Sequence, residues 1–306
     1  MATKSFLKIG IIGFGEVGGI FGRDLAARGI EVATYDILFD QPASREALLA
    51  KARDCGVSAC ESVGDCVRDR ELTFSAVTAS SAAKVAEEVA PMLVAGQIYL
   101  DINSVSPETK SRMAGYFDRS HGHFVEAAVM AAVSPQRLKV PMLLGGRYAA
   151  DFAPKLAAIG MNGKAVSEQV GVASAVKMCR SVIIKGLEAL VVESMFAARR
   201  YGAEDAVLAS LAATYPDMGW QKDLPDYLIS RVAEHGRRRA AEMREAAQAV
   251  TDVGIEPHMA RATAARQDWL ADEILARRLT RSSGEKFSWR ALADAISEAA
   301  KSRDPH

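Results

Sequence analysis

Residues 7–18 read LKIGIIGFGEVG, and this stretch decides the fold. Its first half is an apolar, β-branched run that predicts a buried strand, and its second half spaces three glycines as GxGxxG. Gly13 permits a tight bend after the strand, Gly15 removes a side chain where a phosphate group approaches, and Gly18 lets the next helix pack closely on the strand. The pattern predicts a phosphate-binding strand–turn–helix unit. A glycine-rich turn in another kind of α/β domain is the alternative.

The helix after the turn offers free N–H groups and the positive end of its dipole to phosphate oxygens. We therefore expect the backbone of the turn to bind the pyrophosphate of a dinucleotide. The residues of the turn are Gly13, Phe14, Gly15, Glu16, Val17 and Gly18.

An acidic residue follows the next predicted strand, Glu31 to Tyr35, about 20 residues after the turn. This residue, Asp36, can accept hydrogen bonds from the adenosine ribose, and its charge repels a 2′-phosphate. No arginine or lysine occurs at 37–39. The sequence favours NAD as cofactor, and NADP stays open because a basic residue from a nearby loop could reverse the preference.

Strand and helix patterns alternate through the first half of the chain, which implies right-handed crossovers and a mainly parallel sheet. Beyond about residue 165 the pattern becomes almost entirely helical. We expect an α/β fold with a doubly wound Rossmann domain at 1–168, followed by an all-α domain for substrate binding or dimerisation at 169–306. The further predicted strands are Phe74–Val77, Ile98–Ile102, Phe124–Val129 and Pro141–Leu144. The predicted helices are 17–28, 82–93, 107–116, 172–201, 204–214, 225–250, 257–279 and 288–302. Arg277–Arg290 is predicted to be a solvated turn.

The overall composition excludes several classes of protein. The formal net charge is +0, which argues against nucleic acid as a partner, and no apolar run is long enough to span a membrane. The four cysteines do not have the spacing of a zinc site, and the histidines are scattered, so we expect no metal and reduced thiols in a cytoplasmic protein. The cysteines are Cys55, Cys60, Cys66 and Cys179.

Polar residues also follow two later strands, where ligands collect in an open α/β sheet. Asn103 and Ser104 stand after one strand, and residues 78–80 (Thr78, Ala79 and Ser80) stand after another. We expect both groups to lie near the nicotinamide. For the first segment a helix start is a compatible alternative, because Ser106 followed by Pro107 is a good N-cap sequence.

A lysine stands near the beginning of the longest predicted helix, which opens with GVASAVKMCRS at 171–181. At 100° per residue, Lys177 shares a stripe with Ser181, Ile184 and Glu188. If desolvation lowers its pKa, Lys177 can act as a general acid/base toward a hydroxyl or carbonyl group. A solvated helix lysine is the alternative.

Four motifs occur in a fixed order: the glycine turn, DxxSxxP at 101–107, FVEAAVM at 124–130 and GxxSxxKM at 171–178. Together they resemble the β-hydroxyacid dehydrogenase family, which includes 3-hydroxyisobutyrate and 6-phosphogluconate dehydrogenases, over about the first 190 residues. The resemblance implies hydride transfer between a nicotinamide and a hydroxy acid or related hydroxyl compound. It makes Lys177 the catalytic lysine, places Ser104 near the nicotinamide, makes 126–131 the substrate loop, and implies a homodimer or homotetramer.

The chain departs from the family pattern at its expected substrate site. Met130 replaces a serine, Ala131 replaces a glycine, and Ser181 stands where an asparagine usually assists the lysine. Ile184 replaces the glutamate of the phosphogluconate enzymes, which argues against phosphogluconate as substrate. We expect a bulkier or partly apolar small molecule. The expected substrate-binding residues are Ser104, Val129, Met130, Ala131, Ser181 and His235.

A basic helix near the end of the chain leaves two interpretations open. His235 with Arg231 and Arg238 could recognise an anion, or the residues could form a solvated face with pairs such as Arg238–Glu242. At the level of the whole protein, a non-catalytic nucleotide-binding or regulatory protein is an alternative to a dehydrogenase. Imine reduction is another, but imine reductases generally lack the lysine.

Overall fold

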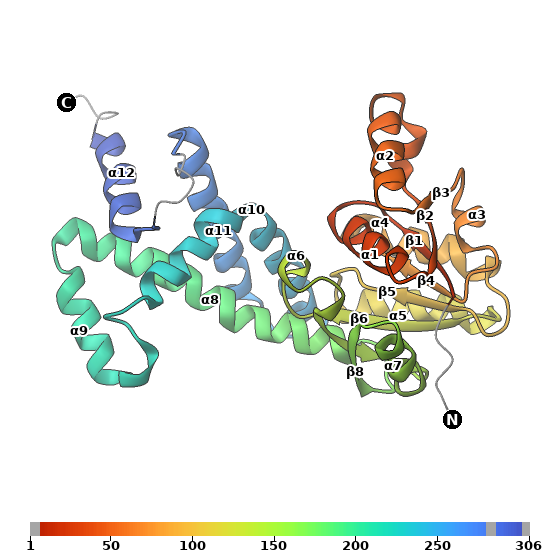
Figure 1. Cartoon of the computed structure of the whole chain (residues 1–306). Helices are drawn as coiled ribbons and strands as arrows, with labels where there is room; N and C mark the ends of the chain where they lie inside the picture. Colours follow the sequence, from red (N-terminus) through yellow and green to blue (C-terminus); the bar gives the residue numbers. More distant parts are fainter. Residues whose placement is uncertain (1–6, 280–285, 302–306) are drawn as a thin grey trace. The chain divides into compact units, whose positions relative to one another are not determined.

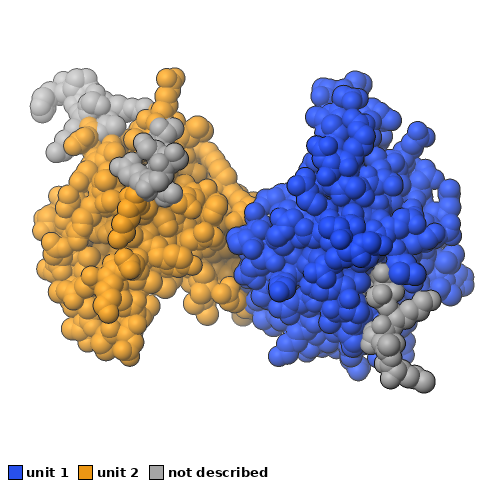
Figure 2. All heavy atoms as spheres, viewed as in Figure 1, with its two compact units in different colours: residues 1–177 blue, residues 178–306 orange. Residues whose placement is uncertain are grey.

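The computed structural model describes residues 7–279 and 286–301 and consists of two compact units, 1–177 and 178–306 (Figure 2). The division falls inside one long helix, α8 (Val172–Tyr201), whereas the sequence placed it between residues 168 and 169. The first nine positions of the predicted second domain thus pack with the first unit. The helix predicted at 288–302 lies partly outside the described residues, and so does the turn predicted at 277–290.

Unit 1 contains one eight-stranded sheet in the order β3-β2-β1-β4-β5-β6-β7-β8 (Figure 1). Strands β1 to β6 are parallel to one another, β7 is antiparallel to β6, and β8 is parallel to β7. The predicted doubly wound, mainly parallel sheet is confirmed. The strands are β1 Lys8–Ile12, β2 Glu31–Tyr35, β3 Ser58–Ala59, β4 Leu72–Ser75, β5 Ile98–Asp101, β6 His123–Val129, β7 Pro141–Gly145 and β8 Asn162–Ser167.

Helices cover both faces of this sheet because successive side chains of each strand point to opposite sides. On β5, Ile98 and Leu100 belong to one buried cluster with α1, whereas Tyr99 between them belongs to the other cluster with α4 and α5. The helices of unit 1 are α1 Glu16–Ala26, α2 Pro42–Asp54, α3 Val63–Val67, α4 Ala79–Val89, α5 Pro107–Tyr116, α6 Val133–Gln136 and α7 Ala149–Ala158. Short 3₁₀ turns include η1 Ile37–Asp40, η2 Ala90–Met92 and η3 Phe117–Arg119.

The described part of unit 2 is helical (Figure 1), as predicted. Its main core packs the later part of α8 against the helices that follow it, with Trp220 and Trp289 both buried in it. Within the described residues, no helix is long and apolar enough to span a membrane. The helices are α9 Glu204–Thr214, α10 Leu224–Thr251, α11 His258–Ala276 and α12 Trp289–Lys301.

Several elements of unit 1 carry weak sequence signals and were not predicted. The edge strand β8 alternates exposed and half-buried positions and has no apolar run, and α2 is mainly polar. β4 begins and ends two residues earlier than the predicted strand 74–77, and its buried side chains include the polar Thr73 and Ser75, which weaken the apolar signal.

Candidate active site

The topology brings the predicted ligand residues to one edge of the sheet. β2 and β3 lie on one side of β1, and β4 and the later strands lie on its other side. The strand order therefore reverses between β1 and β4. Parallel strands share their carboxyl edge, and a crevice outside that edge at the switch point is where such sheets bind ligands. The glycine turn follows β1 there, Asp36 follows β2, and residues 78–80 follow β4 and are exposed.

The glycine turn fits a dinucleotide phosphate. Gly13 has φ +93°, and a Cβ there would collide with the carbonyl oxygen of Ala76, at the end of β4. A Cβ on Gly18 would collide with the carbonyl oxygen of Gly13. By contrast, a Cβ on Gly15 would meet no atom of the described residues within 4 Å apart from those of its two chain neighbours. Packing thus explains two of the glycines, and the open space at the third is where a phosphate group can approach the backbone.

Asp36 fixes the turn from the end of β2. Its carboxylate accepts hydrogen bonds from the N–H of Phe14 at 2.6 Å and of Leu38 at 2.9 Å. Its position matches the predicted one, and each carboxylate oxygen keeps a further lone pair for a ribose hydroxyl. Ribose binding by Asp36 stays a prediction.

A buried ion pair lies behind the loop that follows β5. Asp101 and Lys110 are both fully buried and form a salt bridge, and the Lys110 ammonium also donates to the Asp101 carbonyl at 3.0 Å. Burial raises the pKa of Asp101, while Lys110 and Asn103 lower it. The Asn103 amide donates to Asp101 and, at 2.9 Å, to Ser75. Its Oδ1 is buried without a hydrogen-bond partner in the described structure, which leaves an acceptor available to a ligand.

The loop after β5 meets the predicted catalytic lysine. The Lys177 ammonium donates a hydrogen bond to the Ser104 hydroxyl, although 73 residues separate them in the chain. Both side chains are half-buried. Two residues that the sequence assigned to one reaction are therefore in direct contact within unit 1.

Glu126 holds the start of the lysine helix. This carboxylate is fully buried on β6 and accepts from the N–H of Gly171 at 2.7 Å, the N–H of Ala173 at 3.2 Å and the hydroxyl of Ser174 at 2.7 Å. It satisfies two backbone donors that a helix start leaves unpaired, and its charge is favourable at the positive end of α8. The first residue of the predicted substrate loop 126–131 is thus a structural anchor.

Replacing Glu126 by alanine is expected to leave three buried donors without an acceptor, at about 1–3 kcal/mol each, and to loosen the turn of helix that carries Lys177. The melting temperature should fall, and kcat should fall with it. Glu126→Gln keeps the shape and one acceptor, so it should cost less in both measurements. Differential scanning calorimetry and turnover would check this. Equal stability of Glu126→Ala and the wild type would contradict the anchoring role.

The remaining predicted substrate residues of unit 1 follow the anchor. Val129 ends β6, Met130 donates its N–H to the Pro141 carbonyl at 2.9 Å, and Ala131 is exposed. Val129 and Met130 are half-buried. Val129 and Met130 lie at the carboxyl end of β6, at the same edge as the loop after β5, because β5 and β6 are parallel. Substrate contact by these residues stays a prediction.

Two predicted substrate residues lie in unit 2. Ser181, on α8, is buried 3.5 Å from the Lys185 ammonium, which in turn binds Glu242 on α10 at 2.5 Å. His235 on α10 is half-buried, and burial together with Arg231 and Arg238 lowers its pKa. Neither substrate assignment is tested by these contacts.

The basic face of α10 is only partly solvated. The predicted Arg238–Glu242 pair is present at 2.8 Å, whereas Arg239 is buried and forms a two-bond pair with Glu188 of α8. Lys185, which sequence reasoning missed, is a second lysine on α8; unlike the half-buried Lys177 it is buried, and burial lowers its pKa. No signal within the sequence of α8 distinguishes it from a solvated lysine.

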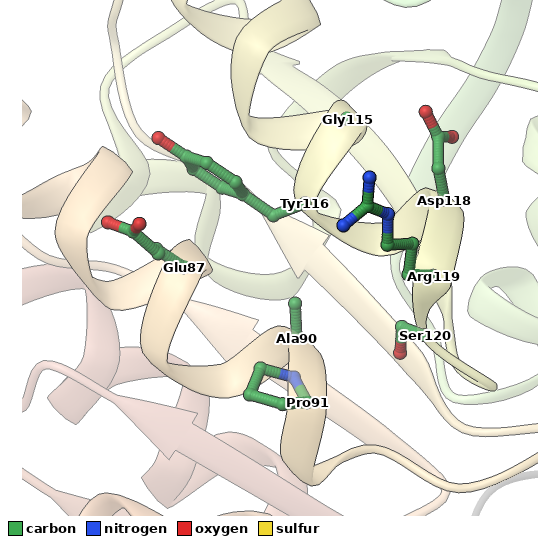
Figure 3. A pocket seen from close by; sticks show the side chains of 8 residues that line it. All are labelled: Glu87, Ala90, Pro91, Gly115, Tyr116, Asp118, Arg119 and Ser120. Carbon is green, nitrogen blue, oxygen red and sulfur yellow. The ribbon is translucent and has the colours of Figure 1, made fainter.

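A surface hollow elsewhere on unit 1 is not part of this site. Figure 3 shows it between the ends of α4–η2 and α5–η3. These helices run back from the carboxyl edge, so their ends lie where the next strands begin, at the opposite edge from the glycine turn. Its lining residues are Glu87, Ala90, Pro91, Gly115, Tyr116, Asp118, Arg119 and Ser120. Among the residues that the structure describes, no cluster of three metal-ligating side chains occurs.

Comparison with known proteins identifies the family. Residues 8–166 match the NAD binding domain of 6-phosphogluconate dehydrogenase, and residues 198–270 match a domain of unknown function, DUF1932. The crystal structure of a conserved hypothetical protein from Sinorhizobium meliloti 1021 is similar, with a TM-score of 0.82, 36% identity and 97% of each chain covered.

Two curated relatives extend this result. An uncharacterised 28.5 kDa protein of Methanothermus fervidus is 30% identical over 84% of this chain and 96% of its own length. Mitochondrial 3-hydroxyisobutyrate dehydrogenase of Bos taurus is 24% identical over 73% of this chain and 66% of its own length. The chain belongs to the family of proteins with the NAD binding domain of 6-phosphogluconate dehydrogenase. The predicted resemblance to 3-hydroxyacid dehydrogenases is confirmed.

Proposed function

We propose that this protein is an NAD(P)-dependent oxidoreductase that transfers a hydride between the nicotinamide and a hydroxy acid or related hydroxyl compound. The hydrogen bond between Lys177 and Ser104 supports the proposal, because Lys177, which is able to transfer a proton, meets the loop after β5, next to the strand that borders the switch point of the sheet. When bound, the nicotinamide supplies the hydride acceptor.

Lys177 moves the proton in this scheme. In the oxidation direction, the substrate hydroxyl gives its proton to the uncharged Lys177 amine as its carbon loses a hydride, which leaves a carbonyl. In the reverse direction, the ammonium returns the proton. Ser104 accepts a hydrogen bond from Lys177, which holds the nitrogen at the edge of the sheet, and its hydroxyl can also donate to a substrate oxygen. Glu126 keeps the first turn of α8 in place for this contact.

The cofactor is assigned to NAD in preference to NADP. Asp36 supports this, because its carboxylate stands at the end of β2 where a 2′-phosphate would meet a negative charge. Thr78, Ala79, Ser80 and Asn103 are proposed to lie along the nicotinamide half. The dissociation constants of NADH and NADPH, measured by quenching of protein fluorescence, give the preference directly.

The substrate is proposed to be a small hydroxy acid with an apolar part, contacted by Ser104, Val129, Met130, Ala131, Ser181 and His235. Incubating the protein with a panel of 3-hydroxy acids and both oxidised cofactors, and following absorbance at the wavelength of the reduced nicotinamide, tests this. Turnover of at least one member is expected. Cofactor binding without turnover on the panel would favour the nucleotide-binding alternative, and turnover of cyclic imines alone would favour an imine reductase.

A homodimer or homotetramer is proposed as the working form, in a reducing, cytoplasmic compartment. The four free cysteines support the compartment. Support for the oligomer comes from apolar side chains that α8 leaves exposed, because exposed apolar patches commonly mark protein contacts. They include Ile183 at 73% and Leu190 at 54% exposure. Analytical ultracentrifugation of the full chain gives the mass.

A further inference from the structure

A lysine of α2 forms hydrogen bonds with the backbone of the glycine turn. The Lys51 ammonium donates to the carbonyl oxygens of Phe14 and Gly15, both at 2.7 Å, and lies 4.8 Å from the centre of the Phe14 ring. Charge-assisted hydrogen bonds of this kind are about twice as strong as neutral ones. The sequence reading of the cofactor site did not include Lys51, because α2 has no motif that links it to the turn.

A fourth glycine makes room for this lysine. A Cβ on Gly19 would lie 2.8 Å from the Cε and 2.9 Å from the Nζ of Lys51. Apart from its chain neighbours and the backbone of its own helix, no other atom of the described residues lies within 4 Å of that Cβ position. Gly19 stands outside the GxGxxG pattern, and Lys51 is therefore the neighbour that accounts for its missing side chain.

The two carbonyl groups belong to the Phe14–Gly15 and Gly15–Glu16 peptide units of the glycine turn. In a trans peptide the C=O and the following N–H point in opposite directions. A cation bound to the carbonyls of Phe14 and Gly15 therefore lies behind the N–H groups of Gly15 and Glu16. These groups stand at the start of α1, where N–H groups lack acceptors within the helix. Gly15 is also the residue whose missing side chain leaves open space in front of the turn.

We propose that Lys51 is a positioning residue for the dinucleotide pyrophosphate. It fixes two peptide planes so that their N–H groups point at the phosphates, polarises those groups through their carbonyls, and adds positive charge behind the turn. The inference rests on the cofactor binding in the proposed function and goes beyond it. Because the pyrophosphate is common to both cofactors, Lys51 should contribute equally to NADH and NADPH binding. A lysine that bound the 2′-phosphate would act on NADPH alone.

Lys51→Met is expected to raise the dissociation constants of NADH and NADPH by about tenfold or more, and by the same factor for both, since a hydrogen bond to a charged group is lost. The KM for the cofactor should rise with them, while kcat stays within about twofold. Gly19→Ala keeps Lys51 but displaces its ammonium. It should therefore raise the dissociation constants of NADH and NADPH by the same factor. Fluorescence quenching at fixed salt gives the four dissociation constants.

Arg53→Met is the matched control, since Arg53 is an exposed cation two positions further along α2 and forms an ion pair with the exposed Glu46. It should leave both dissociation constants unchanged. Circular dichroism melts verify that each variant is folded. Weaker binding of NADPH alone would make Lys51 a 2′-phosphate ligand, and unchanged binding of both would make it a structural tie; either result overturns the proposal. Wild-type protein that bound neither cofactor would overturn the proposed function itself.

Discussion

Replacing Lys177 by alanine is expected to lower kcat by about 10²–10⁴-fold, the range that a positioned general acid/base contributes. The substrate hydroxyl would lose the group that takes its proton as the hydride leaves. The dissociation constant of NADH should stay nearly intact, because the turn, Asp36 and Lys51 lie on other elements. Steady-state turnover on the best hydroxy acid of the panel, together with fluorescence quenching by NADH, measures both quantities.

Two further variants make this result specific. Ser104→Ala removes the hydroxyl that accepts from Lys177, so it should lower kcat by a smaller factor than loss of the lysine itself. Lys164→Ala removes an exposed lysine on β8 and should change neither quantity. If Lys177→Ala kept most of the wild-type turnover, the proposed proton transfer would be wrong whatever the substrate is.

The parts of the site that could be read from the sequence are those with a local pattern. The glycine turn is recognised by the spacing of its three glycines; as predicted, Gly13 and Gly15 lie between β1 and α1, and Gly18 lies in the first turn of α1. Asp36 could be placed because it directly follows a strand of clear β-branched character. Lys177 was located by its position at the head of a long helix.

The parts that could not be read depend on contacts between distant segments. Glu126 resembles the start of a substrate loop, and only the three donors from residues 171–174 reveal it as an anchor for α8. Lys51 and Lys185 look like ordinary helix lysines, since the turn and Glu242 that bind them lie 36 and 57 residues away along the chain. Arg239 follows the predicted basic face residue Arg238 directly, yet it pairs with a buried glutamate from another helix.

Replacing Lys110 by methionine is expected to lower the free energy of unfolding by about 3–5 kcal/mol, the loss found when one partner of a buried ion pair is removed. Both Lys110 and Asp101 are fully buried, so the buried carboxylate of Asp101 would lose its cation and keep hydrogen bonds from the side chain and backbone of Asn103. Urea unfolding followed by circular dichroism measures the change. Lys8→Met is the matched control, because the exposed Lys8–Glu31 pair at 3.8 Å should contribute less than about 1 kcal/mol.

The pH dependence of this loss identifies its cause. Burial already raises the pKa of Asp101, and removing Lys110 takes away a charge that lowers it, so in the variant the folded-state pKa lies further above the unfolded one. The folded variant then holds a proton that the unfolded chain releases, and stability falls as pH rises from the unfolded pKa toward the folded one. The gap in stability between wild type and Lys110→Met should therefore widen from pH 5 to pH 8. Asp101→Asn combined with Lys110→Met removes both charges and should recover part of the loss, with little pH dependence. A gap that stayed constant with pH, or a double variant as unstable as Lys110→Met alone, would mean that lost packing and not an unpaired carboxylate causes the destabilisation.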